Sequence, residues 1–459
     1  MPWLRPALAV SVARSLGMGF ALAFAVAPAS AEPDVARAMQ LAREATVAAD
    51  EKDFSAYLAK MEEAVALRPD FPRMLVNLAA AQVANDRPAD AVATLGRLAA
   101  MGLDSPVERA ADFAAIRERA DFKAVVKKLS DNRIAKGRGE IAFSLRGFSG
   151  LPEGIAWRET TGEFYLSDVN GRAVWVWSRA ADAREGKLRR LTPEGDALYG
   201  VMGLALDEAR GTLWAATSAV AAMRGFTPDM DGTAALAEID LNTGEIRRTI
   251  PIVRRAGDRQ SHVLGDLALA PDGGVFVTDS GGPMIWRLAP GAAELEVLVE
   301  SEEFLSLQGL VVAPGGGALI VSDHANGLLR VALDGAPEVR RIASPPDTTL
   351  IGLDGLALAP NGDIVAIQNG LRPTRVLSIT LDPAYENATA VKVLESAHLP
   401  MAAPSLGTIV RGNEFHFIGN AGWSRFQDLD GKVAAPRSVP IFKTLLPAPE
   451  KKPPGRGGR

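Results

Sequence analysis

The sequence predicts a mainly β protein, a six-bladed β-propeller, with a small α-helical domain in front of it. Residues 34–131 carry apolar side chains at helical spacing, and strand patterns replace this period after the loop "NRIAKGRG". Six later segments each contain a short apolar strand, a turn rich in Gly or Asn, and a second apolar strand. The segments begin near residues 152, 201, 265, 308, 354 and 404. This spacing leaves room for two more strands per unit, as in four-stranded propeller blades.

The first 31 residues predict a secretory signal peptide. Arg5 and Arg14 lead into the apolar run "SLGMGFALAFAVA", and the small residues Ala29-Ser30-Ala31 follow it. The run is too short to favour a spanning helix, and no later stretch is long enough either. We therefore expect a secreted or periplasmic protein with no membrane span after cleavage. A retained N-terminal anchor is the alternative.

The composition is that of a folded, soluble protein. Of the 459 residues, 47% are hydrophobic and 23% are charged. The net charge of −5 argues against nucleic acid as a partner. The chain has no cysteine, which excludes disulfides and thiolate metal sites. Residues 446–459 include the basic, Pro- and Gly-rich end "KKPPGRGGR", for which we predict disorder.

Residues 34–131 contain a stretch that resembles the tetratricopeptide repeat, "RPDFPRMLVNLAAAQVANDRPADAVATLGRLAAMGLD". In this interpretation Pro69 closes one repeat. The apolar and small positions of the next repeat are filled by Leu75, Leu78, Ala79, Ala91, Leu95 and Leu98. About three units are normally needed for a stable stack, so the array is short. Such repeats can dock a protein partner, but we favour a helical spacer or dimerisation module packed on the next domain.

Residues 138–445 are predicted to form the propeller. The turns of the six segments are "ETTG", "EARG", "PDGG", "PGGG", "PNGD" and "RGNE", which contain the residue types that tight hairpins prefer. The earlier segment "GEIAFSL" has no partner of its own. We therefore expect it to complete the last blade and close the ring.

Acidic and amide side chains occur where the innermost strands begin. The innermost strands of a propeller line a central channel, so these positions converge at one opening. In chain order they are Glu153, Met202, the pair Gly265-Asp266, Gln308, Asp354 and Ser405. Such an oxygen-rich set suits a hard cation such as calcium, which takes 6–8 oxygen ligands. A carboxylate among apolar neighbours is otherwise costly unless it is hydrogen-bonded.

The propeller region resembles the senescence-marker-protein/gluconolactonase family (regucalcin and lactonases), with paraoxonases as more distant relatives. The motif "PEGIAW" matches the first-blade motif of that family, and "DGLALAPNGDIVAI" resembles the fifth-blade motif. The resemblance implies a divalent cation, with calcium the favoured ion, held by Glu153 and Asp354. It also implies hydrolysis of a sugar lactone or related ester, in which the cation polarises the carbonyl and Asp354 activates water as general base.

Two positions depart from the family pattern. Gln308 stands in "QGLVV" where the family has Asn, which makes it an amide ligand one methylene longer. In "GDLALAPDG" the Asn position is Gly265, and Asp266 is the displaced candidate for the fourth ligand. His262 lies four residues before Asp266, and we assign it a contact with substrate at the mouth of the channel.

Three aspartates recur at the ends of the second strands, Asp168, Asp279 and Asp323 in "LSD", "VTDS" and "VSDH". Repetition at equivalent blade positions favours a structural role, in which each side chain caps a turn within its blade. We therefore keep these residues out of the predicted site.

Three classes of function remain open from the sequence. The first is a metal-dependent hydrolase of lactones or esters. The second is a non-catalytic periplasmic propeller that acts as a scaffold or binds a sugar-like small molecule, with the helical repeats as a second docking surface. The third, which we favour least, is a six-bladed relative with different chemistry, such as a strictosidine-synthase-like condensation. A fold alone does not decide between them.

Overall fold

The computed structural model describes residues 33–179, 186–195, 197–252, 261–427 and 434–447. The predicted signal peptide and all but the first two residues of the predicted tail lie outside these residues. The described residues belong to one compact unit. Within them, no helix combines the length and the apolar character needed to cross a membrane.

The N-terminal part of the described chain is helical, and we call residues 34–131 the helical segment. It contains the helices α1 (Asp34–Asp50), α2 (Phe54–Leu67), α3 (Pro72–Ala84), α4 (Pro88–Ala100) and α5 (Ala120–Asp131), and the 3-10 turns Val107–Arg109 and Ala111–Ile116. Asp53 caps α2 by accepting a hydrogen bond from the backbone of Ala56, and a proline opens each of α3 and α4. The six side chains predicted to fill the helical core between Leu75 and Leu98 are at most 6% exposed.

The part of the described chain that follows the helical segment forms six four-stranded antiparallel sheets, which confirms the predicted six-bladed propeller. Blade 1 contains β2 (Ile155–Arg158), β3 (Glu163–Asp168), β4 (Ala173–Arg179) and β5 (Gly186–Arg190). Blade 2 contains β6 (Gly200–Asp207), β7 (Thr212–Ser218), β8 (Ala234–Asp240) and β9 (Ile246–Pro251). Blade 3 contains β10 (Leu264–Leu269), β11 (Val275–Asp279), β12 (Met284–Leu288) and β13 (Glu296–Glu300).

Blades 4 and 5 follow the same order from the channel outward. Blade 4 contains β14 (Leu307–Val312), β15 (Ala318–Asp323), β16 (Gly327–Ala332) and β17 (Val339–Arg341). Blade 5 contains β18 (Leu353–Leu358), β19 (Ile364–Gln368), β20 (Arg375–Leu381) and β21 (Ala388–Ser396). Buried aliphatic and aromatic side chains fill the blades and the spaces between them.

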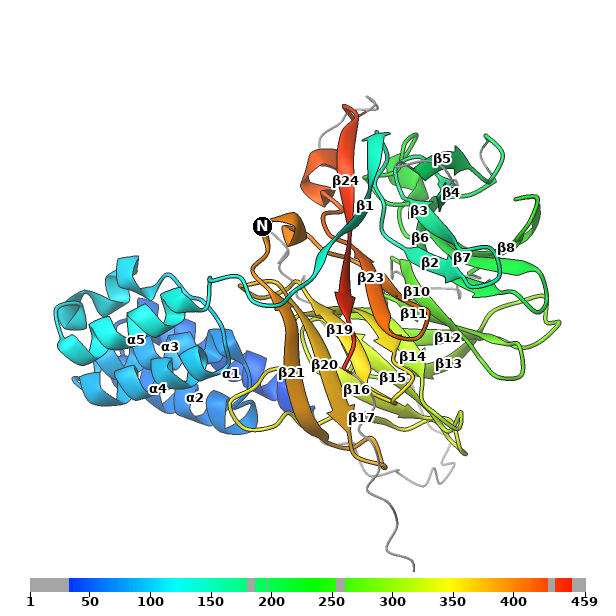
Figure 1. Cartoon of the computed structure of the whole chain (residues 1–459). Coiled ribbons are helices and arrows are strands. Elements are labelled where there is room, and N and C mark those ends of the chain that lie inside the picture. The colour runs from blue at the N-terminus through cyan, green and yellow to red at the C-terminus, as the bar shows by residue number, and fades with distance from the viewer. Residues whose placement is uncertain (1–32, 180–185, 196, 253–260, 428–433, 448–459) are drawn as a thin grey trace, which may run out of the picture. The chain divides into compact units, whose positions relative to one another are not determined.

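Blade 6 joins the two ends of the propeller sequence. It contains β22 (Gly407–Val410), β23 (Glu414–Ile418), β24 (Arg437–Leu445) and, outermost, β1 (Glu140–Phe148). β1 runs antiparallel beside β24, with Glu140 opposite Lys443 (Figure 1). The predicted closure of the ring by "GEIAFSL" is therefore confirmed. Closure of this kind ties the first part of the propeller sequence to the last and leaves no free seam between them.

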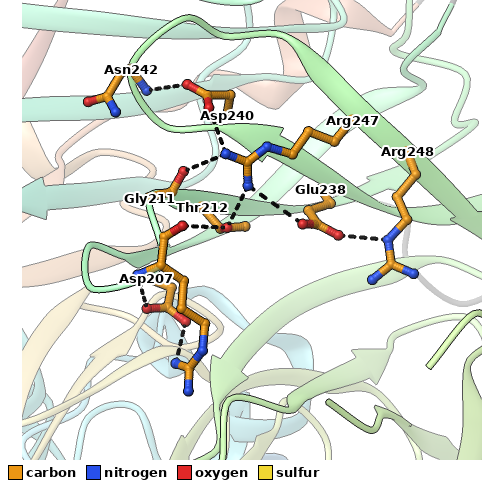
Figure 2. A network of polar contacts seen from close by, with 9 residues as sticks. Asp207, Gly211, Thr212, Glu238, Asp240, Asn242, Arg247 and Arg248 are labelled. Carbon is orange, nitrogen blue, oxygen red and sulfur yellow. Dashed lines mark hydrogen bonds and ion pairs between the residues drawn. The ribbon is translucent and has the colours of Figure 1, made fainter. Parts of the chain in front are cut away.

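Charged side chains fasten the outer strands of blade 2 (Figure 2). Arg247 on β9 donates to Asp240 Oδ2 at 2.6 Å and lies 3.7 Å from Glu238 Oε1. Arg248 donates to Glu238 Oε2 at 2.6 Å and to the carbonyl of Ala292 in blade 3 at 2.7 Å. These contacts are partly exposed, so each contributes little to the stability of the blade.

Candidate functional site

In four blades the innermost strand carries a β-bulge near the residue where it begins. In each of these strands two residues stand opposite a single residue of the second strand, between Val201 and Leu204, Leu264 and Leu267, Leu307 and Leu310, and Leu353 and Leu356. A bulge takes its residues out of the ladder and re-aims their side chains. The predicted site residues Asp266, Gln308 and Asp354 all lie in these bulges. The same local feature therefore presents a polar side chain in three successive blades.

The structure brings three of the predicted ligands together: Glu153, Asp266 and Asp354. Burial raises the pKa of Glu153 to about 8, and repulsion from Asp354 and then Asp266 adds to the effect. Burial likewise raises the pKa of Asp266 to about 7, with a contribution from Asp354. The pKa of Asp354 is also raised by burial, although His324 and Asn369 oppose the shift. Asp354 is buried, whereas Glu153 and Asp266 are half-buried, and desolvation together with mutual repulsion raises the pKa of the three carboxyl groups.

Each of two acids is oriented by a hydrogen-bond donor that lies outside the strands: Trp423 opens the 3-10 helix Trp423–Phe426, and Asn369 lies in the loop after β19. The indole nitrogen of Trp423 donates to Glu153 Oε2 at 2.6 Å. The Asn369 side-chain amide donates to Asp354 Oδ2 and, at 2.9 Å, to the carbonyl of Pro404. His324 Nε2 lies 3.2 Å from Asn369 Oδ1, so the histidine also contacts the side chain that holds Asp354. One oxygen of each acid is therefore fixed by the protein.

Hydroxyl groups fix the backbone of the site residues across blade boundaries. Thr278 in blade 3 donates to the carbonyl of Gln308 in blade 4 at 2.6 Å. Ser322 in blade 4 donates to the carbonyl of Asp354 in blade 5 at 2.5 Å. Ser405 donates to the carbonyl of Glu153 at 2.9 Å and so joins blade 6 to blade 1. The relative positions of the acids thus depend on contacts between neighbouring blades.

Asp266 lies one residue later in its innermost strand than the polar residues of blades 4 and 5 do in theirs. Glycine follows the polar residue in the pairs Glu153-Gly154, Gln308-Gly309 and Asp354-Gly355, whereas blade 3 has Gly265 first and Asp266 second. Asp266 therefore occupies the glycine position of its bulge. Gly203 of blade 2 makes room for it, because a Cβ added there would lie 2.6 Å from Asp266 Oδ1 and 2.8 Å from its Cα.

We expect Gly203→Ala to disturb the cluster more than a surface Gly→Ala change would. The new methyl group would press on the backbone of Asp266, and overpacking of this kind typically costs about 1–3 kcal/mol. Urea unfolding of the variant measures the loss. Gly96→Ala in α4 is the control, because a Cβ at Gly96 meets no atom within 4 Å and its backbone does not have a positive φ. Equal losses in the two variants would contradict the assigned packing.

A cavity of about 390 Å³ runs along the innermost strands of all six blades and reaches Asp266. Apart from Asp266 and Thr408, the side chains that line it are apolar. Most of the surface exposed in the cavity is nevertheless polar. Of the three acids, Asp266 is the one that lines this cavity.

The donor set of the cluster fits a hard divalent cation in its chemistry. Three carboxyl groups and the Gln308 amide offer oxygen ligands. Among the described residues no lysine or arginine forms an ion pair with any of the three acids, so their charge is not compensated by a protein cation. In the same part of the chain, no group of three or more His, Asp or Glu side chains already has the arrangement of a metal site.

No protein-family model and no curated protein matches the chain. Among solved structures, a candidate gluconolactonase is 19% identical, with a TM-score of 0.43, over 68% of this chain and 100% of that one. A regucalcin from Agrobacterium tumefaciens, described as a calcium-binding protein, is 15% identical, with a TM-score of 0.43, over 66% and 95%. An aldose sugar dehydrogenase from Streptomyces coelicolor, in its PQQ-bound form, is 16% identical, with a TM-score of 0.43, over 68% and 99%. Each is a likeness of fold.

The other two predicted site residues, Gln308 and His262, each have a polar partner within their own blade. The Gln308 amide nitrogen donates to Ser306 Oγ at 3.2 Å, which leaves its carbonyl oxygen as the group available to a cation. His262 is 1% exposed, and its Nδ1 lies 2.6 Å from Asp279 Oδ2 inside blade 3. Its ring also packs edge-on against Trp286. His262 therefore has a partner within the blade, and the substrate contact assigned to it stays a prediction.

The structural role predicted for the recurring aspartates is confirmed. Asp168 accepts hydrogen bonds from the backbone of Leu151 and Gly171. Asp323 accepts four backbone hydrogen bonds, from Leu305, Ser306, Ala325 and Asn326. Asp279 accepts three such bonds in addition to its contact with His262. Each carboxylate thus holds the turn that follows the second strand of its blade.

Proposed function

We propose that the chain is a divalent-cation-dependent hydrolase of lactones or related esters, with calcium as the cation. The observation that supports this proposal best is the convergence of Glu153, Asp266 and Asp354 at the bulged ends of innermost strands. Carboxyl groups that are partly or fully buried and repel one another are destabilising on their own, and a divalent cation would compensate their charge. We also propose that the protein acts outside the cytoplasm, on the strength of residues 1–31.

In this proposal the cation is held by oxygen atoms of Glu153, Gln308 and Asp354, with Asp266 as the fourth ligand. A bound calcium ion would supply Lewis-acid polarisation of the substrate carbonyl. Asp354 takes a proton from the attacking water, because Asn369 holds one of its oxygens and leaves the other able to accept.

A binding function is the second candidate, and one observation favours it. The described acids do not already form a metal-binding group. A propeller whose carboxyl groups stay protonated would bind a polar small molecule, such as a sugar-like ligand, through hydrogen bonds at the mouth of the channel. A protein partner at the helical segment would suit this alternative.

The decisive experiment combines elemental analysis of the purified protein with a panel of aldonolactones and simple aliphatic lactones. We expect one bound calcium per chain and ring opening that a chelator abolishes and added calcium restores. Bound calcium without hydrolysis of any lactone would favour the binding function. A protein that holds no metal and opens no lactone of the panel would contradict the proposed function.

A further inference from the structure

Two buried arginines join the helical segment to the loops that surround Asp354. One loop follows β15 and carries His324 and Asn326. The other, residues 369–374, follows β19 and begins with Asn369. Asn369 contacts both Asp354 and His324, so the two loops together form the polar surroundings of that acid.

Arg375, the first residue of β20, binds the end of helix α4. It is 4% exposed and donates to the carbonyl of Met101 at 2.7 Å and to Gln368 Oε1 at 2.8 Å. Met101 is the C-terminal capping residue of α4, and Gly102 follows it with a φ of +73°. A Cβ at Gly102 would lie 3.1 Å from Arg375 Nη1, so glycine allows the close approach. A cation at the carboxyl end of a helix is stabilised by the exposed carbonyl groups there.

No described carboxylate forms an ion pair with Arg375, and burial lowers its pKa to about 10. A buried arginine without an acid is destabilising unless its hydrogen bonds are satisfied. The contacts with α4 and Gln368 are therefore the interactions that keep it in this place. The helix end and the propeller loop depend on each other for this contact.

The hydrogen bonds around Arg375 continue to the neighbourhood of Asp354. Gln368 donates to the carbonyls of Ile351 at 2.7 Å and Thr349 at 3.1 Å, in the segment that leads into β18. Asn369 is the next residue after Gln368. On the far side of the loop, the backbone of Asp104 in the helical segment donates to the carbonyl of Arg372 at 2.8 Å. The loop that holds Asp354 is thus fixed at both ends.

Arg68 in the helical segment makes the second connection. It is 0% exposed and donates to Asn326 Oδ1 at 2.7 Å and to the Asn326 carbonyl at 3.1 Å. Asp70 lies 3.1 Å from Arg68 Nε and provides the counter-charge. Burial opposes ionisation of Asp70, but Arg68 outweighs it, and the pKa of Asp70 lies below its usual value. Arg68 therefore fixes the loop two residues after His324.

We propose that the helical segment is part of the functional site, in which Arg375 is a positioning residue that holds Asn369 against Asp354 through the 369–374 loop. This inference rests on the proposed function for the role of Asp354 as a cation ligand and general base. Whether Arg375 holds the 369–374 loop in place can be measured without that role. Side chains behind the ligands of a metal site typically change metal affinity 10–100-fold when they are removed.

The test compares Arg375→Met with Arg248→Met in the full-length protein. Arg248 is a matched control, because it also joins a side chain to a backbone carbonyl of a neighbouring element but lies on the outermost strand of blade 2 (Figure 2). We expect faster amide hydrogen exchange in residues 349–356 and 369–375 for Arg375→Met alone. We also expect its calcium dissociation constant to rise about 10-fold, with no change for Arg248→Met. Arg375→Lys keeps the charge but loses the planar guanidinium group. We expect it to change the exchange rates and the calcium dissociation constant less than Arg375→Met does.

The outcomes separate this inference from the proposed function. If Arg375→Met increases amide hydrogen exchange only in the helical segment and leaves the calcium affinity unchanged, Arg375 is not a positioning residue. The contact then only attaches the helical segment to the propeller. A wild-type protein that binds no calcium would overturn the proposed function. In that case the exchange measurement still decides whether the helical segment holds the loops. If Arg375→Met does not fold, the lysine variant carries the same comparison.

Discussion

Replacing Asp354 with Asn is expected to remove most lactone hydrolysis and to leave the propeller folded. The amide has nearly the same shape, and its oxygen can still accept the hydrogen bond from Asn369. What it loses is the ability to take a proton from water. Loss of a general base typically lowers the rate 10²–10⁴-fold, and damage to the cation site would add to that. The measurement is kcat/KM on the best lactone of the panel, with calcium in excess.

Gln308→Asn is the companion variant for this test. It shortens the amide by one methylene and introduces the residue type that the resembled family has at this position. We expect activity to be preserved or raised. If Asp354→Asn hydrolyses the lactone as fast as the wild type, Asp354 is not the general base, and the hydrolase mechanism proposed for the cluster is wrong.

The cation-free protein is expected to lose stability as the pH rises from about 4.5 to about 8, and calcium is expected to cancel the loss. The pKa values of Glu153 and Asp266 are raised to about 8 and about 7 in the folded protein, from the usual values of 4.5 and 3.8 for exposed side chains. Between about pH 4.5 and about pH 8, the folded state holds protons on these two side chains that the unfolded chain has released. The free energy of unfolding therefore falls with pH, by about 1.4 kcal/mol per pH unit for each such proton.

Calcium must displace the same protons, so its affinity should rise with pH over this range. At a free concentration one hundred times its dissociation constant, it would stabilise the fold by about 2.7 kcal/mol. Urea unfolding at pH 5, 6, 7 and 8, with chelator and with calcium, measures both effects. Glu153→Gln removes one of the protons and can still accept from Trp423, so its curve should be flatter. A pH profile identical to that of the wild type would show that Glu153 is ionised throughout.

The propeller could be predicted from the sequence because its signal repeats. Six hairpins with turns such as "PDGG" and "PNGD" fix the number of blades, and the unpaired strand around Ile141 predicts the closure on β24. The acids of the cluster could be predicted for the same reason, since "PEGIAW" and "DGLALA" align at the start of the innermost strand. Asp266 stands one position later than Gln308 and Asp354 in the same kind of bulge, because the order of glycine and polar residue is reversed in blade 3.

The surroundings of the acids could not be predicted, because they come from loops that follow no period. Trp423, Asn369 and His324 lie in different blades, and only the folded ring places them beside Glu153 and Asp354. Their orientation depends on tertiary contacts, such as that of Arg375 with α4, which leave no local pattern in the sequence. The partner of His262 could not be predicted either, because Asp279 lies 17 residues further along the chain and meets its ring only in the folded blade.

Closure of the ring by β1 has a consequence for the order in which the molecule assembles. Glu140 pairs with Lys443, so the outermost strand of blade 6 is synthesised long before its partner. Pairings of such high contact order form late, because the chain entropy must be overcome first. The bond from Ser405 to the carbonyl of Glu153 crosses the same seam and can form only when the first and last blades meet. We therefore expect a chain truncated before β24 to keep five complete blades together with β1, β22 and β23, but to leave β1 without its partner and the contact between blades 6 and 1 weakened.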